Sequence, residues 1–177
     1  MQLEPGRGST LPSDEIDASL VLKVAESLIT LRELVGNSIA DRTLKEVIWS
    51  KWELPRLPRP LIDGKYPTAY PWSAPARELF LRSPKKVGRV GGLVIEHALP
   101  KRELLQLVSE RMSTATAADM VQLLQAGCRA VVVTKEEDLQ LTRAGFGHLR
   151  TNTEDLWSRY RETGLDPSTF ALLRDAP

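Results

Sequence analysis

Cysteine and histidine are scarce in this 177-residue sequence, which has one cysteine, Cys128, and two histidines. A single cysteine excludes an intramolecular disulfide framework and any zinc site built from several cysteines. It is typical of proteins that work in a reducing compartment. We therefore expect a cytoplasmic protein without disulfide bonds.

The sequence also has no excess of either charge and no long apolar run. The formal net charge is +1, so any binding to nucleic acid would depend on a local basic patch rather than on the overall charge. No run of 18 apolar residues occurs, so we expect no membrane-spanning helix. Residues 1–15 have no apolar core behind positive charges, so we expect no signal peptide.

Two amphipathic helices are predicted in the N-terminal third. The first covers residues 13–36, with Ser13 as its N-cap and Gly36 at its end. Its apolar residues recur at helical spacing and form an apolar stripe: Ile16, Leu20, Val24, Leu28, Leu31 and Leu34. The second helix covers residues 41–54, with Leu44, Ile48 and Trp52 on one side. The two form a helical hairpin that needs a partner surface, and we expect a homodimer if the rest of the chain does not cover it.

Residues 55–76 are rich in proline and aromatic residues and predict a connector. Six of the twelve prolines lie in residues 55–75, which argues against both a helix and a central strand. Tyr66, Tyr70 and Trp72 alternate with basic residues there, a pattern that can bind a nucleic-acid strand by stacking. The alternative is a proline-stiffened segment whose aromatic rings pack onto the core.

Residues 77–177 predict a small α/β domain. The expected strands cover residues 86–97 and 128–134, and Val131, Val132 and Val133 are expected to form a central strand buried on both faces. Helices are expected over the following ranges: 73–82, 101–112, 113–127, 134–145, 153–164 and 166–175. Thr134 and Glu137 have the spacing of a capping box at the start of one of them. The fold class is α/β (α+β-like), helix-rich, with a small central sheet, a ββα-like unit and the N-terminal helical hairpin of residues 1–54.

Polar residues end both predicted strands. Glu96 and His97 end the first, and Asp138 lies in the helix that follows the second. If the strands pair so that their ends meet, Glu96 and Asp138 supply oxygen ligands suited to Mg²⁺ or Mn²⁺. His97 would then take a proton from water, which would suffice for phosphodiester hydrolysis.

These segments resemble a known family. "LVIEHALP" is similar to the first half of the HNH motif of ββα-metal (His-Me finger) endonucleases, and "VVVTKEEDLQL" is similar to the second half. The resemblance implies that His97 is the general base, that Glu96 binds or supports the metal, and that Asp138 occupies the last-ligand position. The sequence departs from the family by having Asp138 where His or Asn is usual, and by two predicted helices between the halves.

Other charged residues fit the same interpretation. The residues Arg82, Lys85, Lys86 and Arg89 form a basic segment before the first strand that would attract a polyanion. Arg159 and Tyr160 could bind phosphate, but we interpret them as part of a solvated helix face.

We predict an HNH-like metal-dependent nuclease, active or degenerate. The alternative is a non-enzymatic protein-interaction module of the antitoxin, immunity or phage-encoded inhibitor type, which binds through the N-terminal helices and the connector.

Overall fold

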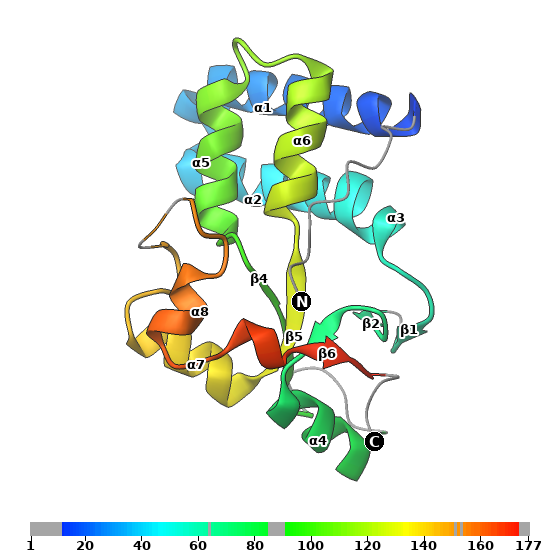
Figure 1. Ribbon diagram of the computed structural model, residues 1–177. Coiled ribbons are helices and arrows are strands. Elements are labelled where there is room, and N and C mark those ends of the chain that lie inside the picture. The colour runs from blue at the N-terminus through cyan, green and yellow to red at the C-terminus, as the bar shows by residue number, and fades with distance from the viewer. Residues whose placement is uncertain (1–11, 64, 85–90, 151, 153, 174–177) are drawn as a thin grey trace. The chain divides into compact units, whose positions relative to one another are not determined.

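The computed structural model describes residues 12–63, 65–84, 91–150, 152 and 154–173 (Figure 1). The described residues form a helix-rich α/β fold with a two-stranded and a four-stranded sheet, as predicted. They divide into two compact units. The helical unit contains residues 12–56 and 101–128, and the sheet unit contains residues 57–100 and 129–173. None of the described helices is long and apolar enough to cross a lipid bilayer.

The helical unit consists of the N-terminal hairpin and a second helix pair. Its elements are α1 (Pro12–Val35), α2 (Asn37–Val47), the π-helix η1 (Ile48–Glu53), α3 (Leu54–Arg56), α5 (Lys101–Arg111) and α6 (Ala117–Gly127). Both α5 and α6 contact α1 (Figure 1). These two helices belong to residues 77–177 in the sequence, but they pack with the N-terminal helices. The compact units are therefore composed differently from the segments 1–54, 55–76 and 77–177.

The buried face of α1 is not the predicted stripe. The helix buries Ala18, Val21, Leu22 and Ala25. In contrast, Ile16 is 69% exposed and Leu34 is 81% exposed, while Leu20 and Leu31 are also exposed. The chain itself leaves the predicted stripe uncovered, because α1 carries apolar residues on two sides, and the expectation that a second copy covers it stays a prediction. The side with the two alanines, whose small side chains permit close helix packing, is the one that is buried.

The sheet unit is built around β5 (Ala130–Thr134). Its other elements are β1 (Leu61–Ile62), β2 (Tyr66–Pro67), β3 (Pro71–Trp72), α4 (Ala74–Arg82), β4 (Leu93–His97), α7 (Lys135–Arg143), α8 (Ser158–Glu162), the 3₁₀ helix η2 (Pro167–Thr169) and β6 (Ala171–Leu172). The four-stranded sheet has the order β4-β5-β3-β6. Val131, Val132 and Val133 have no exposed surface, so the prediction of a central strand buried on both faces is confirmed.

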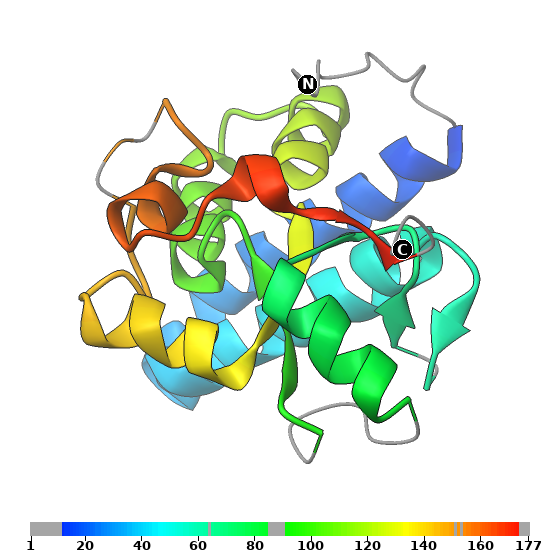
Figure 2. The same cartoon turned by 60° about the horizontal axis from the view of Figure 1, so that its bottom comes forward.

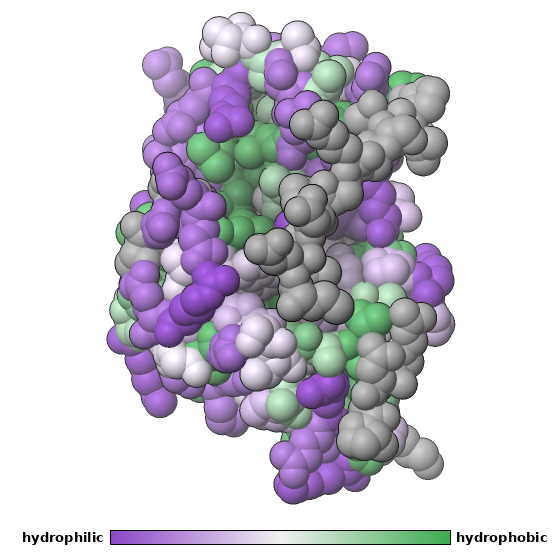
Figure 3. Space-filling model, in the orientation of Figure 1, coloured by the Kyte–Doolittle hydropathy of each residue, from purple (hydrophilic) through white to green (hydrophobic). Residues whose placement is uncertain are grey.

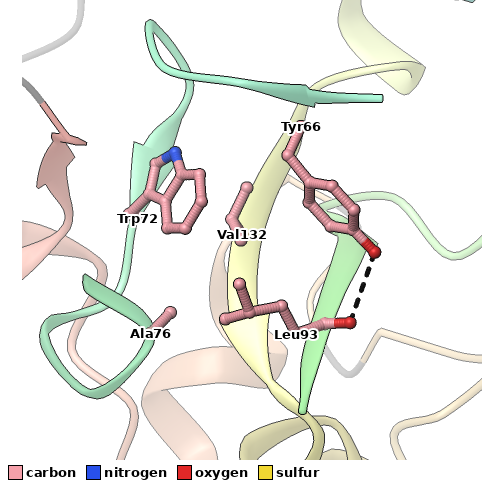
Figure 4. Packing of buried hydrophobic residues seen from close by; sticks show 5 residues of the cluster. All are labelled: Tyr66, Trp72, Ala76, Leu93 and Val132. Carbon is pink, nitrogen blue, oxygen red and sulfur yellow. Dashed lines mark hydrogen bonds between the residues drawn. The ribbon is translucent and has the colours of Figure 1, made fainter. Parts of the chain in front are cut away.

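The two faces of β5 pack against different layers. Val132 lies in a cluster with Trp72 of β3, Ala76 of α4 and Leu93 of β4 (Figure 4). Val131 and Val133 point the other way and pack with Leu141 of α7 and Tyr160 of α8. Helices α4 and α7 accordingly lie on opposite sides of β4 and β5 (Figure 2). Alternating side chains along one strand thus contribute to two separate apolar layers.

The proline-rich segment contributes a strand that the sequence argued against. Pro71 and Trp72 form β3, which lies between β5 and β6. The strand tolerates Pro71, which has no backbone N–H, because the hydrogen bond to β5 is donated by the N–H of Ser73 to the carbonyl of Val132, at 2.9 Å. Trp72 is fully buried and Tyr66 nearly so, so these rings pack onto the core and the stacking interpretation is wrong for them.

The starts of α4 and α7 agree with the sequence better than the C-terminal segment does, whereas α1 begins at Pro12, so that Ser13 lies inside it. Ser73 caps α4, and Thr134 and Glu137 form the predicted capping box of α7. The helix expected over residues 153–164 is short, Ser158–Glu162, and the helix expected over residues 166–175 is a single 3₁₀ turn, Pro167–Thr169, with Asp166 as its N-cap. The residues after this turn form β6, which pairs antiparallel with β3.

Candidate functional site

The side chains of Glu96 and His97 point to opposite faces of the sheet. Val94, two residues before Glu96, packs on the α7 and α8 side, whereas Ile95, two residues before His97, packs on the α4 side. Since side chains alternate along a strand, Glu96 faces the α7 and α8 layer and His97 faces the opposite layer. The predicted acid and base are adjacent in sequence but do not meet at one site.

The pairing of the two strands also separates their ends. Strand β4 runs antiparallel to β5, with Leu93 opposite Thr134 and His97 opposite Ala130. The expectation that the two carboxyl ends lie together is therefore wrong. His97 and Thr134 lie at opposite ends of a five-residue ladder, roughly 13 Å apart along the strand direction.

Asp138 nevertheless approaches Glu96, because α7 packs against β4. The Asp138 carboxylate contributes to raising the pKa of Glu96, as a nearby like charge does. Glu96 therefore faces the layer of α7, the helix that carries Asp138, whereas His97 faces the opposite layer.

A buried arginine occupies this side of the sheet. Arg159 of α8 has no exposed surface. Its Nη2 group donates to the Glu96 carboxylate and to the backbone carbonyl of His97. Its Nη1 group donates to the carbonyl of Phe146, at 2.8 Å, and its guanidinium lies 5.1 Å from the centre of the Tyr160 ring. Arg159 therefore ties α8 and the segment after α7 to the end of β4.

The environment shifts the protonation equilibria of three groups. Burial raises the pKa of Glu96, although Arg159 opposes this effect. Burial lowers the pKa of His97 to about 4; the Glu96 carboxylate opposes this shift, while Arg159 and Lys65 add to it. Burial also raises the pKa of Tyr160. Perturbed groups concentrate at functional sites, but buried ion pairs that only stabilise a fold produce the same shifts.

The Glu96 carboxylate is not free to bind a divalent cation. The Glu96 carboxylate already accepts from the Arg159 guanidinium, whose positive charge would repel a metal ion at the same oxygen atoms. Among the described residues, no group of three or more His, Cys, Asp or Glu side chains is placed to hold a metal. The chemistry that this cluster supports is the stabilisation of a negative carboxylate by a fixed guanidinium.

The predicted nucleic-acid-binding residues are only partly described. Arg82 lies at the end of α4, has an exposed side chain and pairs with Glu78 one turn earlier. Lys85, Lys86 and Arg89 lie outside the described residues. The prediction of a basic binding segment therefore stays a prediction.

Sequence reasoning missed the role of Arg159. We interpreted it as part of a solvated helix face, and its complete burial shows that this was wrong. One signal was available, because Arg159 stands between Trp157 and Tyr160 in a segment with few other apolar residues. The two rings pack on each other at 5.5 Å, which marks this short helix as part of the core.

Glu137 is a second buried acid whose partners lie far apart in the sequence. Its carboxylate accepts from the Thr134 backbone N–H and from the Ser73 hydroxyl, each at 2.7 Å. Ser73 also caps α4 by accepting from the N–H of Ala76. One carboxylate thus connects the starts of α4 and α7.

Comparison of the chain with protein-family models, with curated proteins and with solved structures finds no match.

Proposed function

We propose that this chain is a non-enzymatic protein-interaction module that binds through its helical unit. The observation that carries the proposal is the exposure of large aliphatic side chains on α1 and α2. Leu34 is 81% exposed, Ile16 69% and Ile39 52%. Five of the exposed large aliphatic residues lie on α1 alone, namely Ile16, Leu20, Ile29, Leu31 and Leu34. Exposed apolar residues that lie together mark interaction surfaces more often than isolated ones do. Apolar side chains also gather between α5 and α6 on the face shown in Figure 3.

The ionisable residues of the sheet unit argue against catalysis there and so favour the binding role of the helical unit. The Arg159 guanidinium is fully buried and hydrogen-bonded to the Glu96 carboxylate, so its charge is not presented to a substrate. The Glu96 side chain is 19% exposed, and Nε of Arg159 has no hydrogen-bond partner among the described residues. A general base works best when its pKa is near the working pH, whereas the pKa of His97 is about 4. These residues are better explained as a stabilising polar cluster that connects α8 to the sheet.

The test is capture of partners by the 177-residue chain from an extract of the cells that encode it. Each captured protein is then purified and its affinity measured by calorimetry. We expect Leu34→Glu combined with Ile39→Glu to weaken binding by about tenfold or more. The matched control is Leu149→Glu, since Leu149 is 59% exposed but belongs to the sheet unit. Equal loss in the control, or the absence of any saturable partner, would contradict the proposal.

The nuclease remains a second candidate, because one observation favours it. Strands β4 and β5 pair and helix α7 packs against both, which agrees with the strand, strand and helix unit that the HNH-like resemblance implies. Cleavage of plasmid and RNA by the wild type, His97→Ala and Asp138→Ala, with Mg²⁺, with Mn²⁺ and with chelator, decides it. Metal-dependent cleavage that both variants lose would establish the nuclease. Identical trace cleavage in all three would leave the binding function.

A further inference from the structure

The exposed side of α1 carries a continuous row of side chains at helical spacing. The members, separated by three or four residues, are Ile16, Leu20, Lys23, Ser27, Leu31 and Leu34, and all six are exposed. Residues so spaced lie along one face of a helix. The row has an aliphatic pair at each end and a polar centre, whereas the face with Ala18 and Val21 is buried within the helical unit.

This row is self-complementary when it is reversed. If α1 packs antiparallel against a second α1 about a two-fold axis, Ile16 meets Leu34 of the other copy and Leu20 meets Leu31. At the centre, Lys23 meets Ser27. A two-fold interface of this kind uses the same surface on both copies. A parallel arrangement would instead place Lys23 against Lys23, where like charges repel.

We propose that the partner of this face is a second copy of the chain, packed antiparallel along α1. The inference rests on the proposed function, because it names the partner of the apolar surface on the helical unit.

Charge and shape support this occupant. Glu26, one residue from Ser27, is exposed, so the antiparallel register places it within reach of Lys23 of the other copy. A hollow of about 630 Å³ lies beside the N-terminal end of the row, between α1 and α6, and Ile16, Leu20 and Ala117 are among its lining residues. Leu34 of the other copy faces this hollow in the antiparallel register, and it is the most exposed large aliphatic side chain described.

Cross-linking distinguishes the two orientations. Single-cysteine variants Ile16→Cys and Leu34→Cys are prepared in a Cys128→Ser background and oxidised separately and as a mixture. The antiparallel dimer predicts strong cross-linking only in the mixture, between position 16 of one chain and position 34 of the other. Cross-linking of each variant with itself would mean parallel packing and would overturn the proposal.

Light scattering measures the assembly itself. We expect the wild type to have twice the chain mass of 19.7 kDa. Leu34→Glu and Lys23→Glu are expected to raise the dissociation constant of the dimer at least about tenfold, and Lys23→Glu combined with Glu26→Lys should recover part of that loss. Leu149→Glu, the control in the other unit, should leave the dimer unchanged. Circular dichroism establishes that each variant is folded.

The outcomes separate the inference from the proposed function. A wild-type monomer at high concentration that still binds a different protein through Leu34 and Ile39 would overturn the dimer and leave the interaction module standing. A monomer that binds no protein would overturn both.

Discussion

At the scale of single residues, Arg159 holds together the polar cluster of the sheet unit, which consists of its guanidinium, the Glu96 carboxylate and two backbone carbonyls. It is the only positive group hydrogen-bonded to the Glu96 carboxylate among the described contacts, and it also satisfies the backbone carbonyls of His97 and Phe146. A buried ion pair adds little when it is intact, but the loss of one partner leaves an uncompensated charge inside the protein.

Arg159→Met is therefore expected to lower the free energy of unfolding by about 3–5 kcal/mol. Urea denaturation followed by circular dichroism measures the change. Arg161→Met is the matched control on the same helix, because Arg161 is half exposed and pairs with Asp155 at the surface. Its expected cost is below about 1 kcal/mol. Similar effects of the two changes would show that burial of Arg159 is unimportant.

At the scale of elements, the N-terminal ends of α4 and α7 in the sheet unit are joined by hydrogen bonds to one side chain. Glu137 completes the capping box of α7 and at the same time holds Ser73, the N-cap of α4. The two helices lie in different layers on β5, so this carboxylate coordinates their positions across the sheet.

We expect Glu137→Ala to destabilise the fold by about 2–4 kcal/mol, because buried donors of Ser73 and Thr134 lose their acceptor. The neighbouring Glu136 is exposed in the same helical turn, which makes Glu136→Ala the natural control, with an expected change below about 0.5 kcal/mol. Urea denaturation of both variants measures the difference. An equal effect at the two positions would contradict the role given to Glu137.

At the scale of the whole molecule, stability should depend on pH through His97. Its pKa is lowered from 6.5 to about 4 in the folded protein, so folding favours the neutral ring. The resulting stability is fully present above pH 6.5 and is lost as the pH falls toward 4. The total effect is at most about 3 kcal/mol.

The measurement compares the wild type with His97→Gln by urea denaturation at pH 7 and at pH 4.5. The wild type should lose more stability than the variant over this interval, because glutamine cannot become charged. The Glu96, Arg159 and Lys65 charges near His97 are present in both proteins, so their own contributions largely cancel in the comparison. Parallel loss in the two proteins would exclude His97 as the cause.

The sequence alone determined the features that depend on neighbours within about four residues. The cap residues Ser73 and Thr134, the capping box with Glu137 and the buried strand of three valines were all predictable. Such features follow from hydrogen bonds and apolar spacing inside one segment, so they need no knowledge of what the segment packs against.

Only the tertiary structure decided which faces and segments meet. The antiparallel register of β4 and β5 separated His97 from the end of β5, and side-chain alternation turned it away from Glu96. The packing of α8 made Arg159 a core residue, and the contacts of α5 and α6 decided which side of α1 is buried. These outcomes depend on contacts between residues tens of positions apart in the chain. Alternative pairings of the same segments differ in how much apolar surface they bury and in their steric fit, and such differences leave no local periodicity in the sequence.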